Sequence, residues 1–189
     1  MGEVEIPLEA LYGPQTQRAI NNFRFTAKPL PWTFIETLLE IKSAAATANR
    51  RLGLLDAEKA TAIEEAVAYL LANMAVAHFP LTAYQTGSGT STNMNVNEVI
   101  VSMARGKGVS LSANDHVNLG QSSNDVIPSA ISLTAAKMVK NRLRSSIPPL
   151  ADGIREFASH HHAVIKTGRT HLMDALPNRL EAEMEAWAA

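Results

Sequence analysis

In the first half of the chain, apolar positions recur at alternating intervals of four and three residues over two stretches. The first stretch begins at Phe34 and ends before Gly53, a residue type that commonly follows the last turn of a helix. The second follows Asp56, a good N-terminal cap, and continues to Ala77. Because a heptad-like seam runs along each stretch, we expect two helices that pack as an antiparallel hairpin.

Helical spacing returns twice more, each time after an irregular polar segment. Residues 81–92 are rich in Gly, Ser and Thr, and they lead into a helix that we expect to end near Arg105. Residues 106–119 are again irregular, and the apolar pattern that follows continues through Pro148 and Pro149. Since proline removes a backbone donor and bends a helix, we expect one long kinked helix or two nearly coaxial ones.

The last part of the chain is expected to end in a further helix. After His160–His162 the pattern predicts a loop at residues 166–171, then a helix capped by Asp174 with Pro177 in its first turn. The helix-forming pattern reaches Ala189 without a stop signal, so we expect a fragment of a longer protein. Taken together, the periodicity predicts an all-α fold.

Composition supports this fold class and excludes several functions. Hydrophobic residues make up 46% of the chain and aromatic residues only 5%, which favours packed, alanine-rich helices. The 17 basic and 18 acidic residues nearly cancel, so bulk charge predicts neither a nucleic acid nor an anionic membrane as partner. The chain has no cysteine, which excludes disulfide scaffolds, zinc fingers, iron–sulfur clusters and thiol nucleophiles. With no secretory signal pattern and no long apolar run, we expect a soluble protein of a reducing compartment.

Three segments place small hydroxyl and amide side chains where we expect a helix to begin. They are Gly87-Ser88-Gly89-Thr90, Gln121-Ser122-Ser123-Asn124 and Gly168-Arg169-Thr170-His171. Free backbone N–H groups and the helix dipole favour an anion at such positions. Three segments of this kind suit a small dicarboxylate held by neutral donors, although each could instead simply cap its helix.

Other motifs point to no further chemistry. There is no Gly-Lys-Ser/Thr loop for a nucleotide phosphate. Ser88 lacks the glycine two residues to either side that a nucleophile elbow requires. The adjacent histidines His160–His162 do not face one site on a helix, so we predict no metal there.

Four segments resemble conserved regions of class II fumarases, which belong to the fumarase/aspartase superfamily, and they occur in the family's order. They are Leu11–Arg18, Gln85–Val99, Asn114–Asp125 and Gly168–Pro177. The resemblance implies an N-terminal helical domain at residues 1–120 and, at 121–189, the start of a central helical bundle that forms a homotetramer in the family. It also implies reversible hydration of fumarate to L-malate, a tricarboxylic acid cycle reaction, without metal or organic cofactor, in the cytoplasm or the mitochondrial matrix.

The resemblance implies roles for individual residues as well. His171 would polarise the water that adds to, or leaves from, C2 of the substrate, a step that suits imidazole because it exchanges protons near neutral pH. Removing a proton next to a carboxylate creates a dianion, which donors placed in advance must stabilise. The implied substrate ligands are Ser88, Gly89 and Thr90, Ser122, Ser123 and Asn124 from a neighbouring subunit, and Thr170.

The chain departs from the family pattern at two places. Ser112-Ala113-Asn114-Asp115 stands where fumarases commonly have His-Pro-Asn-Asp, so the secondary carboxylate site would lack its imidazole. The Gly-Ser-Ser signature loop, which supplies the serine base in the family and lies well downstream, does not occur. We therefore expect the isolated chain to be inactive.

Two alternatives remain open at this stage. Aspartases resemble the chain closely but usually carry Gln where His171 stands, and other lyases of the superfamily differ more widely in all three loops. A non-catalytic helical binding or assembly module would need the apolar seams but not the hydroxyl-rich segment around Ser88. Fumarate hydration is therefore the favoured interpretation.

Overall fold

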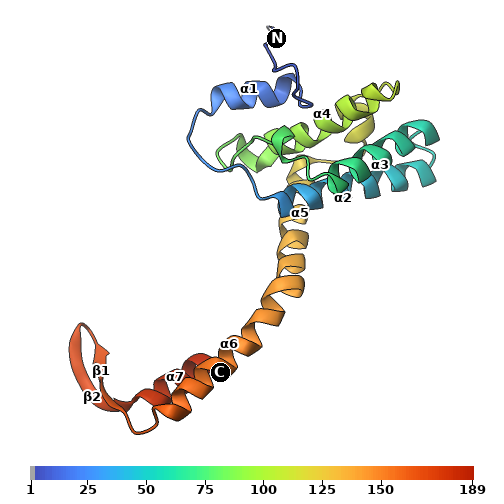
Figure 1. Cartoon of the computed structure of the whole chain (residues 1–189). Helices are drawn as coiled ribbons and strands as arrows, with labels where there is room; N and C mark the ends of the chain where they lie inside the picture. Colours follow the sequence, from blue (N-terminus) through green and yellow to red (C-terminus); the bar gives the residue numbers. More distant parts are fainter. Residues whose placement is uncertain (1–2) are drawn as a thin grey trace. The chain divides into compact units, whose positions relative to one another are not determined.

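The computed structural model describes residues 3–189, which form two compact units (Figure 1). The first unit ends at Thr134 and the second comprises Ala135–Ala189. Both are mostly helical, which confirms the predicted all-α class. The predicted boundary between residues 120 and 121 concerns the family's domains and stays a prediction. None of the described helices is both long and apolar enough to span a bilayer.

The helices of the first unit are joined by loops that contain short helical turns. The helices are α1 (Pro14–Asn22), α2 (Trp32–Arg51), α3 (Ala57–Ala72), α4 (Thr90–Gly106) and most of α5 (Ser123–Met138). The short turns are η1 (Val76–His78), η2 (Gly87–Gly89) and η3 (Ala113–Val117).

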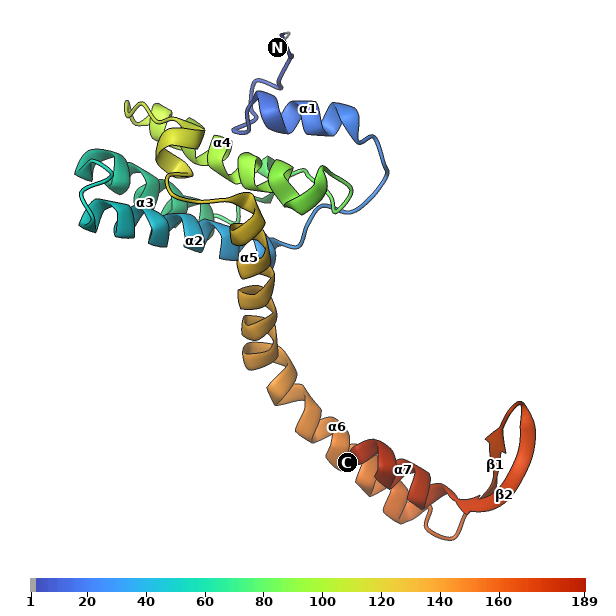
Figure 2. The same cartoon turned by 180° about the vertical axis from the view of Figure 1, so that it is seen from behind.

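Helices α2 and α3 lie side by side and antiparallel, with α4 packed next to them (Figures 1 and 2), so the predicted helical hairpin is confirmed. Gly53 follows α2 with a φ of +71°, a backbone conformation that glycine adopts without strain. Asp56 directly precedes α3 as predicted, but its carboxylate pairs with Lys59 Nζ at 2.9 Å instead of capping the backbone. Helix α3 ends at Ala72 rather than near Ala77, because Met74 takes a left-handed φ of +42°.

The core of the first unit lies between α2, α3 and α4. Its fully buried side chains include Leu38, Leu39, Ile63, Leu70, Val96 and Ile100. Helix α4 is unusual because it also buries polar side chains, among them Asn93, Asn95, Asn97 and Glu98. Because a buried polar group is costly without a partner, these residues indicate local hydrogen-bond networks.

Glu98 supplies the cap of α1 from another helix. Its carboxylate accepts the backbone N–H groups of Gly13, Gln15 and Thr16 at 2.8–3.1 Å and the Thr16 hydroxyl at 2.7 Å. The free N–H groups and positive dipole end of α1 therefore meet a buried negative charge. Gly13 is required for this approach, because a Cβ there would lie 2.7 Å from Glu98 Cδ.

Removal of this cap is expected to destabilise the chain. Glu98→Ala leaves buried N–H groups unpaired, so we expect the free energy of unfolding to fall by about 3 kcal/mol. Glu65→Ala is the matched control, since Glu65 forms only an exposed ion pair with Lys107 and its loss costs less than about 1 kcal/mol. Urea unfolding followed by circular dichroism measures both. Equal losses in the two variants would contradict the assignment.

Helical hydrogen bonding continues beyond α5 through one π-helical turn, η4 (Val139–Leu143), into α6 (Arg144–His160). Pro148 and Pro149 lie inside α6, so the helix predicted to pass through both prolines is confirmed. The π-helical turn η4 ends at Leu143, directly before Arg144 and Ser145, whose carbonyls lie four residues before the two prolines and so receive no N–H group from them. Ser145 and Ser146 both donate their hydroxyls to Arg142 O at 2.9 Å, which gives that carbonyl side-chain partners.

The predicted helix starting after Asp174 is wrong. The chain instead forms an antiparallel hairpin of β1 (Ile165–Thr170) and β2 (Met173–Arg179), and α7 (Leu180–Ala188) begins only afterwards. Asp174 and Pro177 therefore lie in β2. The pattern of Asp174 and Pro177 resembles a helix start, but no helix forms there because pairing with β1 satisfies the backbone groups of this segment. Helix α7 packs along α6, and Arg155 donates to Ala188 O at 2.7 Å.

Candidate functional site

The first hydroxyl-rich segment is a strained turn at the start of α4. Ser88 and Gly89 have φ values of +61° and +65°, and a left-handed backbone is unfavourable for a serine. The cap of α4 comes from Gln85, whose Oε1 accepts the Thr92 backbone N–H and hydroxyl at 2.9 Å each. Ser88 and Thr90 are exposed, and within residues 3–189 neither side chain has a hydrogen-bond partner. Helix capping therefore does not account for these two hydroxyls.

The second segment lies at the start of α5, as predicted. Ser122 Oγ accepts the Asn124 backbone N–H at 3.3 Å, so this serine does act as a local cap. Ser123 Oγ has a different partner, because it accepts Asn93 Nδ2 of α4 at 2.9 Å. Asn124 is exposed, as is Ser122.

The structure brings these two segments to neighbouring helices of one unit. A Cβ on Gly89 would lie 3.0 Å from Ile127 Cδ1, one turn into α5. Asn93, on the first turns of α4, reaches the start of α5 through Ser123. The predicted ligands Ser88 to Thr90 and Ser122 to Asn124 therefore belong to two helix starts that pack together.

The third segment is not at a helix start, so this part of the prediction is wrong. Thr170 ends β1, and His171 and Leu172 form the two-residue turn of the hairpin, with φ values of +51° and +60°. Such turns favour Asn or Gly, so a His-Leu pair is held in a costly conformation. Both residues are exposed at the end of a two-stranded ribbon of the second unit.

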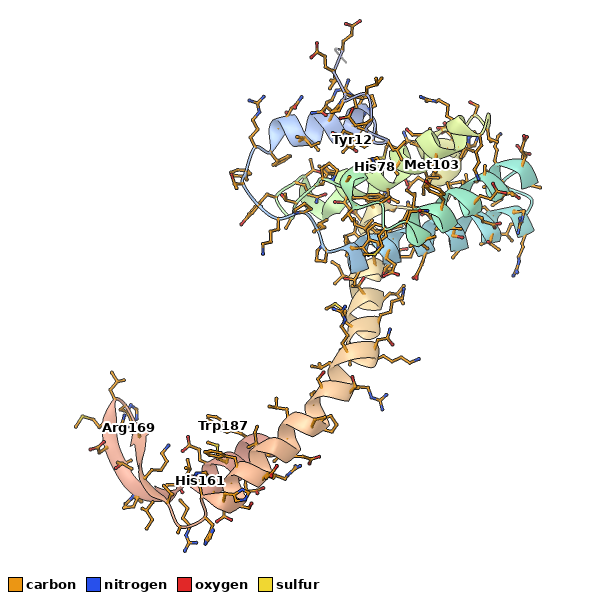
Figure 3. The ribbon with its side chains drawn as sticks, viewed as in Figure 1. Tyr12, His78, Met103, His161, Arg169 and Trp187 are labelled. Atoms are coloured by element: carbon orange, nitrogen blue, oxygen red, sulfur yellow. The ribbon has the colours of Figure 1, made fainter. Side chains whose placement is uncertain are left out.

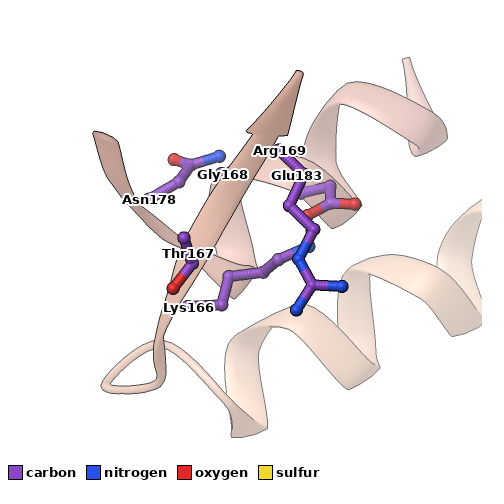
Figure 4. Close-up of a pocket in the computed structure, with 6 residues that line it drawn as sticks. All are labelled: Lys166, Thr167, Gly168, Arg169, Asn178 and Glu183. Carbon is purple, nitrogen blue, oxygen red and sulfur yellow. The ribbon is translucent and has the colours of Figure 1, made fainter. Parts of the chain in front are cut away.

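The hairpin beside this turn carries several charged and amide side chains. Figure 4 shows Lys166, Gly168 and Arg169 on β1, with Asn178 opposite on β2 and Glu183 on α7. Lys166 pairs with Glu183, and Arg169 lies 3.8 Å from Asp174. A Cβ on Gly168 would lie 2.8 Å from Leu176 O, so only glycine allows the two strands to approach here.

The polar groups of the segment Ser112–Asp115 form hydrogen bonds with one another. Ser112 Oγ accepts the Asp115 backbone N–H at 3.1 Å and donates to Asp115 Oδ2 at 2.7 Å, which caps the turn η3. His116 supplies an imidazole, but its Nδ1 accepts the Ser112 backbone N–H at 2.9 Å. The geometry is therefore that of a structural turn.

The three adjacent histidines bond to their own helix end. Each Nδ1 lies 2.8–3.0 Å from a carbonyl three or four residues earlier. His161, labelled at the end of α6 in Figure 3, stacks on Phe157 with ring centroids 4.1 Å apart. In the part of the chain that the structure describes, no three His, Asp or Glu side chains gather as a metal site requires. His78 does not belong to this group, because it lies in the short turn η1 of the first unit. Partial burial lowers the pKa of His78.

Sequence reasoning missed a buried polar network behind the second segment. Lys42 of α2 is fully buried, and its Nζ donates to Asn118 Oδ1 and Gln121 Oε1 at 2.9 Å each. Burial lowers the pKa of Lys42 to about 7. Asn118 Oδ1 also accepts Nδ2 of Asn93 and of Asn97, at 3.1 and 3.4 Å. A lysine four residues after Leu38, on the apolar stripe of its helix, was the available signal.

Comparison with known protein families identifies the class of this protein as a lyase. The sequence model of the lyase family matches residues 2–189, and the chain belongs to that family. It is 48% identical over 189 residues to fumarate hydratase class II 2 of Pseudomonas aeruginosa and 48% identical over 190 residues to the class II enzyme of Xylella fastidiosa. These alignments cover 100% of this chain but 41% and 40% of the relatives, so the chain spans about 40% of their length.

Solved structures agree with this assignment. A class II fumarase from Schistosoma mansoni matches with a TM-score of 0.83 and 37% identity, over 99% of this chain and 41% of that one. A fumarate lyase:delta crystallin from Brucella melitensis matches with a TM-score of 0.82 and 36% identity, over 99% and 45%. The resemblance to class II fumarases that the four motifs indicated is confirmed.

Proposed function

We propose that this chain carries substrate-binding segments of a class II fumarate hydratase, which adds water reversibly to fumarate to give L-malate. The observation that supports this most is that the Ser88 and Thr90 side chains are exposed and have no hydrogen-bond partner within residues 3–189. Gln85 already caps α4, so both hydroxyls and the adjacent free N–H groups are available to an anion. The similarity to fumarate hydratases over the whole chain supports a dicarboxylate as that anion.

In the proposed reaction, one substrate carboxylate is held by the segment Ser88 to Thr90. Ser122 to Asn124 add further donors. The family resemblance implied that they come from a neighbouring subunit, but their helix start packs beside that of Ser88 to Thr90 in the same unit, which favours one shared site. Thr170 binds substrate beside His171. During hydration, His171 polarises the water whose oxygen bonds to C2, while C3 gains a proton. In the reverse direction C3 loses that proton and the C2–O bond breaks with release of water. Neutral donors stabilise the dianion between these steps, so no cofactor is assigned.

We also propose that copies of this chain associate, as the four subunits of a homotetramer. Support comes from large apolar side chains that are exposed along residues 138–157 of the second unit: Met138, Val139, Leu143, Ile147, Leu150 and Phe157. An exposed apolar face of this kind marks an interaction surface.

The cytoplasm is the compartment that we assign to the protein.

Aspartase activity is the second candidate, and His171 argues against it because aspartases usually carry glutamine at this place. A purely structural helical module is a weaker alternative. Such a module gains nothing from the strained turn at Ser88, since that serine neither caps α4 nor packs into the core.

A hybrid enzyme tests the proposal. Residues 1–189 are joined to the part of the Pseudomonas aeruginosa fumarate hydratase that follows its matched region. The family resemblance implies that this part supplies the Gly-Ser-Ser loop, which does not occur in residues 1–189. We expect the hybrid enzyme to consume fumarate, measured by its ultraviolet absorbance, at a rate that ammonia does not change. The 189-residue chain alone is expected to show no turnover, because half of the acid/base pair is missing.

Two outcomes would contradict the proposal. Formation of aspartate from fumarate and ammonia by the hybrid enzyme would indicate an aspartase. A folded hybrid enzyme without either activity would favour the binding module instead. Circular dichroism and sedimentation show whether the hybrid enzyme is folded and associated.

A further inference from the structure

Lys42 is a buried amine without a carboxylate partner among the described residues. Its side chain is fully buried in the first unit, and within residues 3–189 it forms no ion pair with a carboxylate. Two neutral amide oxygens, of Asn118 and Gln121, are its partners. A well-packed apolar side chain at this place would avoid the desolvation cost of the ammonium group. Lys42 therefore contributes hydrogen bonds to Asn118 and Gln121 in place of apolar packing.

The partners of Lys42 lie just before the second substrate segment. Asn118 and Gln121 flank the turn that leads into Ser122 and Ser123, and Lys42 joins them from helix α2. Asn118 Nδ2 also donates to Gln121 O at 3.0 Å, and Gln121 Nε2 donates to Val117 O at 2.9 Å. Lys42 thus closes a small network that holds the path of the backbone into α5.

The network ends at the Ser123 hydroxyl. Asn93 Nδ2 donates both to Asn118 Oδ1, which Lys42 also binds, and to Ser123 Oγ. Because Ser123 Oγ accepts a hydrogen bond from inside the protein, its own hydrogen remains to be donated outward. Asn118 Oδ1 thus accepts from both Lys42 and Asn93, and the same Asn93 Nδ2 group holds the Ser123 hydroxyl oxygen. An O–H group held in one orientation suits a carboxylate ligand.

The side-chain amides of Asn93 and Asn97 belong to the same network. Both direct Nδ2 at Asn118 Oδ1, and Asn93 also directs it at Ser123 Oγ. Helix α4 therefore holds the same Asn118 oxygen that Lys42 binds from α2.

We propose that Lys42 is a positioning residue of the dicarboxylate site, which orients the Ser122–Asn124 segment and the Ser123 hydroxyl through Asn118, Gln121 and Asn93. This inference rests on the proposed function, because the anion it serves is the substrate carboxylate. Lys42 itself is buried behind the segment and is assigned no contact with substrate.

Lys42→Met in the hybrid enzyme tests this role, with Lys59→Met as the matched control, because Lys59 pairs with Asp56 at the start of α3. We expect Lys42→Met to raise KM for fumarate about tenfold and to change kcat less than about threefold, since the segment binds the substrate's carboxylate throughout the reaction. Lys42→Arg, which keeps N–H donors at this position, is expected to recover part of the affinity. A purely structural role would lower the folded fraction and the apparent kcat but leave KM unchanged.

Amide hydrogen exchange on the 189-residue chain gives a second readout that needs no activity. Lys42→Met is expected to speed exchange at residues 118–124 while α3 keeps its protection, and Lys59→Met is expected not to do so. If exchange responds but the unsubstituted hybrid enzyme is inactive, the proposed function fails while the positioning network stands. Unchanged exchange at 118–124, or an unchanged KM in an active hybrid enzyme, would overturn the inference.

Discussion

In the hybrid enzyme, His171→Asn is expected to lower kcat for fumarate hydration by at least about a hundredfold, with little change in KM. Asparagine cannot exchange a proton with the attacking water, whereas the neutral donors of the other segments still bind the substrate. Asparagine also accepts a left-handed backbone readily, so it fits the φ of +51° at this turn. The expected loss is therefore chemical and not a consequence of misfolding. Initial rates over a range of fumarate concentrations separate kcat from KM.

His160→Asn is the matched control for this substitution. His160 is exposed and its Nδ1 lies 2.9 Å from the carbonyl of Glu156, at the end of α6. We expect its replacement to leave both kinetic constants within about twofold, as is usual for exposed positions away from a site. If His171→Asn behaved like His160→Asn, the role of His171 in the water step would be wrong.

The stability of the 189-residue chain is expected to rise with pH above neutrality because of Lys42. Burial lowers the pKa of Lys42 from 10.5 to about 7, so between these values the unfolded chain binds a proton that the folded chain does not. The free energy of unfolding therefore increases with pH, by about 1.4 kcal/mol per unit and about 5 kcal/mol over the whole window. Urea unfolding between pH 7 and about 9.5 measures this slope.

Lys42→Met should remove the slope, and Lys59→Met should keep it, because Lys59 is partly exposed at the start of α3. The chosen window avoids two other groups. Partial burial keeps the pKa of His78 below its usual range, and burial together with Glu9 raises the pKa of Tyr12. Both therefore titrate outside the interval of the experiment. A flat profile in the unsubstituted chain would show that Lys42 is not held neutral by the fold.

The elements that the sequence predicted well are those whose pattern is local. The stretch from Phe34 to the glycine at position 53 became α2, with that glycine in a left-handed conformation. The segment around Ser88 preceded α4 as expected, because glycines and hydroxyls interrupt the apolar spacing there. The helix through Pro148 was recognised because its apolar positions continue on both sides of the proline.

The largest error occurred where a partner far along the chain decided the local structure. Asp174 and Pro177 carry the local pattern of a helix start, yet they pair with β1 across the turn at His171. The residues next to Asp174 in the sequence do not indicate that this segment pairs with β1. The end of α3 was also misplaced, since a left-handed residue at Met74 breaks a pattern that reads as continuous.

The sequence by itself determined the helical class, the positions of α2 and α4, and the motifs that identify a lyase related to class II fumarases. Only the tertiary structure decided that Gln85, and not Ser88, caps α4, that His171 lies in a strained hairpin turn, and that Lys42 supports the segment before Ser123. Helices and motifs depend on neighbours three or four residues away, which a pattern records. Lys42 meets its partners 76 and 79 residues further along the chain, and such contacts exist only after the helices have packed.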